Sequence, residues 1–404
     1  MERLDQRLAE LDAKGLRRRL RTLVGPQGPH VNLGGKRVLL LCSNNYLGLT
    51  AHHSVLAAGA AAAERWGSGA GSSRLISGTM EPHLALERAL AEFHGYESSL
   101  IFGSGYLANL GVISTLVGPG DLVCSDRLNH ASIVDGCRLS GAEKRIFRHR
   151  DLAHLESILA SAQARAADRT LIVSDGVFSM DGDVAPIAAL LELARRYDAM
   201  LMIDDAHGVG SLGPGGRGAV AEAALGGEVD IITGTLGKAL AGYGAYACCS
   251  DRMRELLINS ARSFIFSTAP PPPAVAAAHA ALDTIRSRPD LVRKLGENAA
   301  VLRESLIDCG LAIGDSRTQI IPLLVGSATR AVAACELALS HGVYAQAIRP
   351  PTVPEGTSRL RLSVMASHRA EELREAAAVI ADAIATTAEP TTAIALGTPI
   401  ADAA

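Results

Sequence analysis

Short apolar segments alternate with longer amphipathic segments through the middle of this 404-residue chain. The short segments are typical of buried strands, and the long ones repeat their apolar residues at helical spacing. This alternation predicts an α/β domain in which helices cover a mostly parallel sheet. The expected strands are residues 98–102, 122–125, 170–174, 200–204 and 230–233, and the expected helices are residues 82–94, 106–117, 131–140, 152–162 and 187–196.

The alternation stops at a run of prolines at residues 270–273. The segments after it predict a smaller α+β domain: a helical region to about residue 307, strands at 319–325, 344–348 and 359–364, and helices at 330–341 and from residue 369. A chain of this length exceeds one ordinary core. We therefore expect an N-terminal helix and strand segment (1–50), a large domain (51–273), a small C-terminal domain (274–385) and a disordered tail (386–404).

Composition narrows the class of protein. Hydrophobic residues make up 48% of the chain, charged residues 20%, and the net charge is −3, so we expect an ordered protein that does not bind nucleic acid. The seven cysteines form no Cys-x-x-Cys pair, which favours a reducing cytoplasm and gives no metal site. No apolar run is long enough to span a membrane, and residues 1–21 lack the apolar core of a signal peptide.

Lys238 follows a predicted strand, between small residues in an otherwise apolar region. Loss of solvation lowers the pKa of a lysine there and supplies the neutral amine that attacks an aldehyde. An ordinary surface lysine is the alternative.

Two nucleotide-binding motifs are excluded. A Walker A loop would need glycine at Ile232, and it would need serine or threonine at Ala239 to hold magnesium. The two overlapping Gly-x-Gly-x-x-Gly matches between Gly208 and Gly218 do not open a helix directly from their strand, so they do not indicate a nicotinamide cofactor.

Two carboxylates and a histidine, Asp204, Asp205 and His207, end the predicted strand before that of Lys238. Neighbouring parallel strands open into one crevice, so we expect Asp204 and Lys238 to lie close together. A buried carboxylate needs a positive partner, which the protonated ring nitrogen of a cofactor would supply. The alternative is that Asp204 or Asp205 caps a turn and His207 is a structural histidine.

A glycine turn, Gly103–Gly105, leads from a predicted strand into a helix at Tyr106. Free backbone N–H groups at a helix start favour a phosphate, and the hydroxyl of Thr235, and of Ser267 or Thr268, could reach the same group. A flexible strand-to-helix turn is the alternative.

Two further loops follow strand ends. The ring of His130 could stack on a planar cofactor, or it could cap a helix or fill the core. Ser179 could bond a substituent of that ring, and a simple turn at 181–182 is the alternative.

Together with Ser43–Gly48 (SNNYLG), these motifs resemble the α-oxoamine synthases from about residue 16 to residue 385. The resemblance implies fold type I (aspartate aminotransferase-like), pyridoxal 5'-phosphate (PLP) as cofactor, and a homodimer. Residues 348–361 are most similar to the family member of biotin biosynthesis, which implies that L-alanine condenses with a pimeloyl thioester of coenzyme A or acyl carrier protein and CO2 is lost. The alternatives are the relatives that make 5-aminolevulinate, 2-amino-3-oxobutyrate or ketosphinganine.

The resemblance also implies a role for each cofactor residue. Lys238 holds the cofactor as a Schiff base and acts as the general base, and Asp204 pairs with the ring nitrogen. His130 stacks on the ring, while His207 and Ser179 contact the side of its phenolic oxygen.

The phosphate would be held by Gly105, Tyr106 and Thr235, with Thr268 or Ser267 reaching it from a second subunit. For the substrates, Arg349 would clamp the amino acid carboxylate, while Thr352 and Arg17 (or Arg18 or Arg19 after a register shift) would line the acyl site. Either His130 or His207 would polarise the thioester or the β-keto acid.

Overall fold

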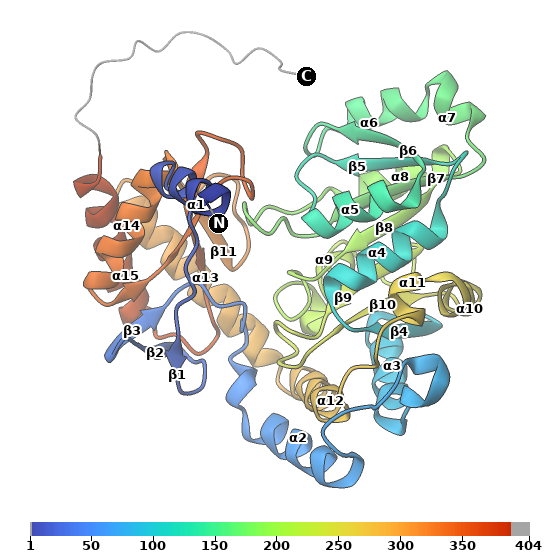
Figure 1. Ribbon diagram of the computed structural model, residues 1–404, viewed down its shortest axis with the longest axis horizontal. Coiled ribbons are helices and arrows are strands. Elements are labelled where there is room, and N and C mark those ends of the chain that lie inside the picture. The colour runs from blue at the N-terminus through green and yellow to red at the C-terminus, as the bar shows by residue number, and fades with distance from the viewer. Residues whose placement is uncertain (1, 389–404) are drawn as a thin grey trace.

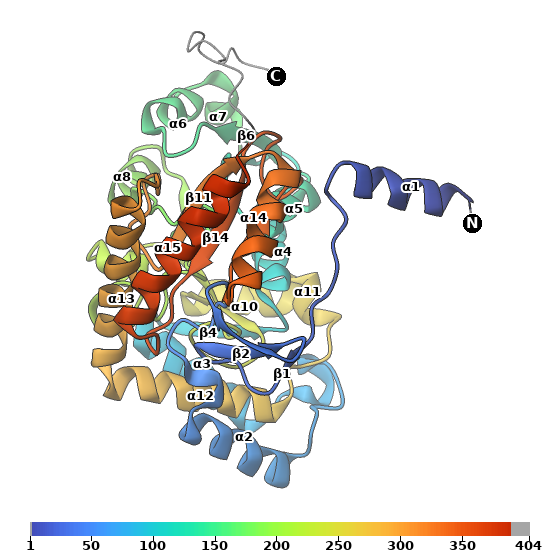
Figure 2. The same ribbon diagram turned by 90° about the vertical axis from the view of Figure 1, so that its left-hand side faces the viewer.

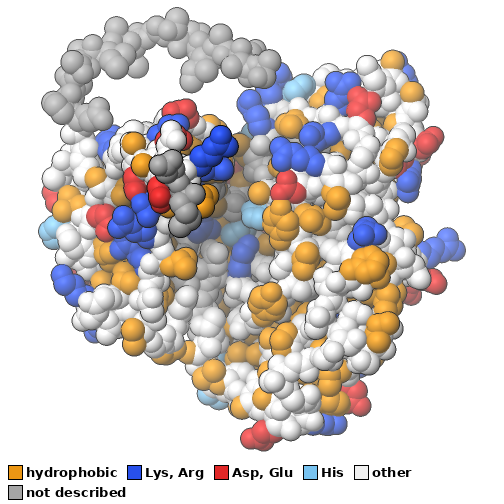
Figure 3. Space-filling model, viewed as in Figure 1, with side chains coloured by type: hydrophobic (Ala, Val, Ile, Leu, Met, Phe, Trp, Pro, Cys, Tyr) orange, Lys and Arg blue, Asp and Glu red, His pale blue; other side chains and the backbone are white. Residues whose placement is uncertain are grey.

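The computed structural model describes residues 2–388, and most of the expected tail, residues 389–404, lies outside them. The molecule has two halves, which Figure 1 shows side by side. The larger half is built around a seven-stranded sheet and the smaller half around a three-stranded sheet. Figure 3 shows a hollow between the halves, in which histidine and cationic side chains are visible.

The large sheet has the strand order β4-β10-β9-β8-β7-β5-β6. All five expected strands are confirmed, each end within two residues of the prediction. Two more strands were not expected: β6 is an exposed, charged edge strand, and β10 is uniformly buried without alternation. The bounds are β4 (Ser98–Phe102), β5 (Leu122–Asp126), β6 (Glu143–Phe147), β7 (Thr170–Asp175), β8 (Met200–Asp204), β9 (Ile231–Thr235) and β10 (Ala245–Cys249).

Helices cover both faces of this sheet. Side chains that alternate along one strand pack into two different cores: Ile172 of β7 belongs to one, and Leu171 and Val173 belong to the other. Burial on both faces explains why these strands are continuous apolar runs. The covering helices include α3 (Glu81–His94), α4 (Gly105–Leu116), α5 (Ala131–Ser140), α8 (Ile187–Arg196), α9 (Ala219–Glu222), α10 (Asp251–Ser260) and α11 (Arg262–Ile265).

The single helix expected at residues 152–162 is wrong. Two helices occupy this region, α6 (Leu152–Leu159) and α7 (Ala162–Ala166). The side chain of Ser161 accepts a hydrogen bond from the backbone N–H of Ala164 and so caps the start of the second helix.

The smaller half packs three helices side by side against its sheet, as Figure 2 shows for α13, α14 and α15. The strand order is β11-β14-β13. The expected continuous strand 344–348 is wrong, because its first part pairs with the N-terminal sheet instead. The bounds are α12 (Pro272–Ser287), α13 (Pro289–Asp308), β11 (Ile320–Gly326), α14 (Ala328–Ser340), β12 (Val343–Tyr344), β13 (Gln346–Ile348), β14 (Ser358–Ser363) and α15 (Ala370–Thr386).

The N-terminal strands join the smaller half although they are some 300 residues away in sequence. The helix α1 (Glu2–Ala13) projects from the body (Figure 2), and β1 (Leu23–Val24), β2 (His30–Leu33) and β3 (Lys36–Leu40) form a sheet with β12. The next segment runs along the smaller half before it enters α2 (His53–Trp66): the carbonyl of Leu41 accepts from Ser363, and that of Tyr46 from Ala366. This path brings the Ser43–Gly48 (SNNYLG) segment to the hollow.

A tight turn after β7 connects the two halves. The carbonyl of Gly182 accepts hydrogen bonds from the backbone of Arg317 (3.1 Å) and the hydroxyl of Thr318 (3.0 Å), in the segment that enters β11. Gly182 has a φ of +69°, and a Cβ atom there would lie 2.0 Å from the carbonyl oxygen of Ile320. Only glycine fits this position without displacing the backbone.

Gly182→Ala should therefore lower the free energy of unfolding by at least about 3 kcal/mol. Gly215→Ala is the matched control, because Gly215 has a φ of +64° but open space around it. The control should lose only about 1 kcal/mol. Denaturant unfolding of both variants measures the difference, and equal losses would contradict the close contact.

Candidate active site

Lys238 lies three residues after the end of β9, at the carboxyl edge of the parallel strands. Its Nζ is 2.8 Å from Nε2 of His207. Burial lowers the pKa of Lys238 to about 8, while the charge of Asp204 acts in the opposite direction. About a tenth of the amine is therefore neutral at pH 7 and able to act as a nucleophile.

Asp204 is the last residue of β8, which pairs in parallel with β9 as expected. Its Oδ2 accepts from Nδ2 of Asn109 (2.6 Å), and its Oδ1 accepts from the backbone of Ala206 (3.0 Å). Asn109, on α4, is itself oriented by the hydroxyl of Thr233, which donates to its Oδ1 (2.9 Å). The carboxylate is thus held in place from two sides while its charge faces the crevice of Lys238.

A second carboxyl group lies on the neighbouring strand. Asp175 ends β7 in register with Asp204 and is buried. Burial, together with the adjacent charge of Asp204, raises the pKa of Asp175 well above its usual value. Its carboxyl group accepts a hydrogen bond from the backbone N–H of His130 (3.1 Å).

Asp205 points away from the crevice into the core. It is fully buried, its Oδ1 has no hydrogen-bond partner, and burial raises its pKa to about 7. Of the two adjacent aspartates, only Asp204 faces the site.

His207 connects Lys238 to the smaller half and to the N-terminal segment. Its Nδ1 is 2.6 Å from the hydroxyl of Tyr46, which is 3.1 Å from Oδ1 of Asn44. Arg361, on β14, donates to the same Oδ1 (3.3 Å). Burial, and then the charges of Lys238 and Arg361, lower the pKa of His207 well below its usual value, so the ring is neutral.

His130 caps the start of α5 and remains exposed to the hollow. Its Nδ1 is 2.7 Å from the hydroxyl of Ser132, which also accepts from Asn109 (2.8 Å). The ring is therefore connected through two side chains to Asp204. The carbonyl oxygen of Ser179 accepts a hydrogen bond from Nε of Arg361 (2.6 Å).

The expected phosphate residues come together through strand register. Phe102, which precedes the glycine turn, pairs with Ala245, and Ala245 pairs with Thr235. Gly105 then begins α4, and Tyr106 is exposed beside it. Thr268 is exposed on the separate segment after α11, and the structure places it against Ser73.

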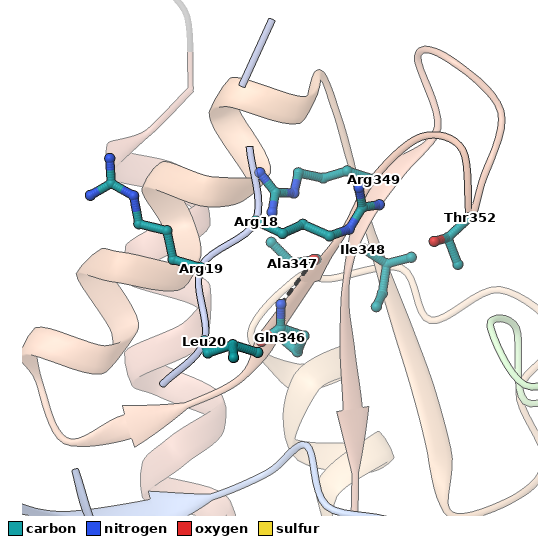
Figure 4. Close-up of a pocket in the computed structure, with 8 residues that line it drawn as sticks. All are labelled: Arg18, Arg19, Leu20, Gln346, Ala347, Ile348, Arg349 and Thr352. Atoms are coloured by element: carbon teal, nitrogen blue, oxygen red, sulfur yellow. Dashed lines mark hydrogen bonds between the residues drawn. The ribbon is translucent and has the colours of Figure 1, made fainter. Parts of the chain in front are cut away.

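The expected substrate residues gather elsewhere. Arg349 and Thr352 line a cavity of about 310 Å³ whose other cationic residues are Arg18 and Arg19 (Figure 4). Arg349 also donates to the carbonyl oxygen of Arg17 (3.4 Å). Among the described residues, the arginine that lies against Tyr46 and His207 is Arg361, not Arg349.

Four residues of this site were missed by sequence reasoning: Asp175, Asn109, Tyr46 and Arg361. Asp175 offered the same signal as Asp204, an aspartate at the end of an apolar run. The other three carried no local signal, because each acts through a partner that is distant in the sequence.

His149 joins the two loops that carry His130 and Ser179. Its Nδ1 is 3.0 Å from Asp126, the last residue before the first loop, and its Nε2 is 2.8 Å from Asp183, which follows the second. Burial alone would lower the pKa of His149, but the two carboxylates raise it to about 9. The charged imidazolium thus fixes both loops to each other.

The interaction of charged His149 with Asp126 and Asp183 should make a pH-dependent contribution to the free energy of unfolding. The pKa of His149 is raised from about 6.5 in the unfolded chain, so its contribution is complete below pH 6.5 and is lost as the pH rises through about 9. Wild type should exceed His149→Gln by about 2 kcal/mol at pH 6 and by much less at pH 9.5. Denaturant unfolding of both proteins between pH 6 and pH 9.5 measures this difference. A difference that stays constant across the range would show that the charge of His149 does not contribute.

Comparison with known proteins identifies the family. Residues 36–380 match the family model "Aminotransferase class I and II". The 8-amino-7-oxononanoate synthase of Geobacter sulfurreducens is 53% identical over 93% of this chain and 96% of its own, and that of Pelobacter propionicus is 50% identical over 92% and 95%. The chain belongs to the 8-amino-7-oxononanoate synthase family.

Solved structures agree in fold. A serine palmitoyltransferase of S. paucimobilis with bound PLP superimposes with a TM-score of 0.90 at 31% identity, covering 95% of this chain and 97% of that one. An 8-amino-7-oxononanoate synthase of Francisella tularensis gives 0.74 at 26% identity, covering 86% and 98%. The predicted fold class, a PLP-dependent transferase of fold type I, is confirmed.

The chain is accordingly a PLP-dependent acyltransferase, and its site fits that cofactor. Lys238 supplies a partly neutral amine, and Asp204 supplies a carboxylate held by amide donors. Within residues 2–388, no cluster of His, Cys, Asp and Glu side chains is arranged to hold a metal ion, and no helix has both the length and the hydropathy to cross a bilayer.

The pKa of Lys238 predicts how the rate of PLP binding depends on pH. With a pKa near 8, the neutral amine increases about 10-fold between pH 7 and pH 9 and then levels off. The rate at which the cofactor-free protein takes up PLP should follow this curve. The visible absorbance of the bound cofactor measures it, and a rise of about 100-fold that continues above pH 9 would indicate an ordinary lysine instead.

Proposed function

We propose that the chain condenses L-alanine with a pimeloyl thioester to give 8-amino-7-oxononanoate, CO2 and the free thiol, the step of biotin biosynthesis that its relatives are named for. The observation that carries this proposal is 53% identity over 93% of the chain to a synthase of that name, combined with the Lys238 and Asp204 pair in one crevice. The acyl carrier is coenzyme A or acyl carrier protein.

PLP, when bound, supplies a ring that accepts the electron pair left on the alanine Cα. Asp204 would pair with the ring nitrogen and favour its protonated form, and Asn109 holds the carboxylate in place. Lys238 would hold the cofactor, and its neutral amine would accept the proton from the alanine Cα. His130, whose position is fixed by the hydroxyl of Ser132, would cover one face of the ring.

Two arginines are candidates for the alanine carboxylate. Arg361 is buried, lies close enough to Lys238 to lower its pKa, and is oriented by Ser179 and Asn44. Arg349 lies in the cavity with Arg18 and Thr352. We infer that Arg361 binds the carboxylate, while Arg349, Thr352 and Arg17 line the path of the thioester.

Replacing each arginine separates these roles. Arg361→Gln should reduce kcat/KM for alanine about 30- to 100-fold, the loss expected for a charge-assisted hydrogen bond, with little change in the KM of the thioester. Arg349→Gln should raise the KM of the thioester instead. Steady-state kinetics with each substrate varied in turn measures both, and the reverse pattern would assign the alanine carboxylate to Arg349.

The substrate assignment is tested by following thiol release. Alanine, glycine and serine are each paired with pimeloyl, succinyl, acetyl and palmitoyl thioesters, on both coenzyme A and acyl carrier protein. Alanine with the pimeloyl thioester should give the highest kcat/KM, and Lys238→Ala should abolish turnover. Preference for another pair would reassign the chain to a different α-oxoamine synthase.

We also propose a homodimer in the cytoplasm. Leu75, Ile76 and Phe266 are exposed by 49%, 80% and 71%, on adjoining segments next to the pair Ser73 and Thr268. A second copy of the chain that covered this patch would bury apolar surface next to Thr268, one of the residues expected to hold the phosphate. A monomer in sedimentation analysis would refute the dimer.

A further inference from the structure

A chain of hydrogen bonds runs from Arg361 to Lys238 through three other side chains. Arg361 Nη2 lies 3.3 Å from Asn44 Oδ1, Asn44 Oδ1 lies 3.1 Å from the Tyr46 hydroxyl, and that hydroxyl lies 2.6 Å from His207 Nδ1. His207 Nε2 then lies 2.8 Å from Lys238 Nζ. Tyr46 is fully buried, and the exposed fraction of His207 is 9%.

His207 and Tyr46 each have one proton to donate within this series of hydrogen bonds. His207 is neutral, because burial lowers its pKa well below the usual value, so its ring carries one N–H. Tyr46 stays a phenol, because burial raises its pKa, so it also has one proton to donate. That proton points either to Asn44 or to His207.

The arginine decides between the two directions. Arg361 has only donors, so it fixes the Asn44 amide with its oxygen toward Tyr46. If Tyr46 donated to His207, its oxygen and that of Asn44 would face each other at 3.1 Å without a proton. If Tyr46 donates to Asn44, every contact has one donor and one acceptor: His207 Nδ1–H donates to Tyr46, and His207 Nε2 accepts from Lys238.

We propose that Tyr46 is a positioning residue that fixes the ring proton of His207 on Nδ1 and leaves Nε2 as an acceptor for the amine of Lys238. This inference rests on the role proposed for Lys238 but not on the substrates. An acceptor at this point favours the charged amine, and the carboxyl groups of Asp204 and Asp175 act in the same direction. Burial and the charge of Arg361 act against it.

Tyr46→Phe removes the acceptor of the Nδ1 proton. A buried N–H without a partner is unfavourable, so the ring proton should move to Nε2 and point at Lys238. That arrangement requires the neutral amine, because only the neutral amine has a lone pair. The pKa of Lys238 should fall by about one unit, which is a 10-fold change in the ratio of neutral to charged amine.

Tyr246→Phe is the matched control. Tyr246 is also fully buried, and its hydroxyl is 2.8 Å from a ring nitrogen of a buried histidine, His94. Its contacts do not include Lys238. The control loses the same kind of hydrogen bond and should leave the titration of Lys238 unchanged.

The measurement uses the full chain without cofactor. Limited acetylation at graded pH, followed by mass spectrometry, gives the titration of Lys238, and Lys14, Lys36, Lys144 and Lys294 in the same samples are internal references. A lower pKa in Tyr46→Phe alone supports the proposal. An unchanged pKa, or an equal shift in Tyr246→Phe, overturns it.

A second measurement observes the ring proton directly, and it also serves if Tyr46→Phe folds poorly. The 15N spectrum of the histidines in the wild-type chain, with the signals of His207 assigned by their loss in His207→Gln, should show Nδ1 protonated. A protonated Nε2 in the wild type overturns the proposal. Because neither measurement involves turnover, a failed condensation assay would count against the proposed function and not against this inference.

Discussion

The pairing of three parallel strands, β7, β8 and β9, is the constraint on which the site depends. Their register places Asp175 beside Asp204 and carries the chain from Thr235 to Lys238 along the same edge. Two carboxyl groups so close together in a low-dielectric environment do not both ionise readily. The amide of Asn109 holds the carboxyl group of Asp204 in place, and burial beside Asp204 raises the pKa of Asp175.

The second requirement is that distant parts of the chain meet at this edge. Tyr46 comes from the N-terminal segment and Arg361 from β14, and both reach His207 on the large sheet. The N-terminal strands are held to the smaller half by the pairing of β3 with β12. Any movement of the smaller half toward or away from the large sheet therefore moves Tyr46 and Arg361 together relative to Lys238.

Much of this could be predicted from the sequence, because buried parallel strands are apolar runs that end in polar residues at the crevice. That rule located Lys238, Asp204 and the strands that carry them. It failed for β6, whose charged residues lie at an exposed edge, and for β10, whose sequence Ala-Tyr-Ala-Cys-Cys consists mostly of small side chains rather than branched apolar ones. It also gave no means of finding Tyr46 or Arg361, because their importance lies in contacts between segments some 160 to 320 residues apart.

The buried side chain of Asp205 explains a pattern that first resembled a nucleotide-binding loop. A Cβ atom at Gly208 would lie 1.9 Å from one oxygen of this carboxyl group, and one at Gly218 would lie 2.0 Å from the other. The glycines at both ends of the run thus leave space for an acid inside the protein rather than for a phosphate outside it. The two adjacent aspartates point in opposite directions and therefore constrain the same segment in different ways. Asp204 places a carboxylate in the crevice, and Asp205 requires glycine at positions 208 and 218.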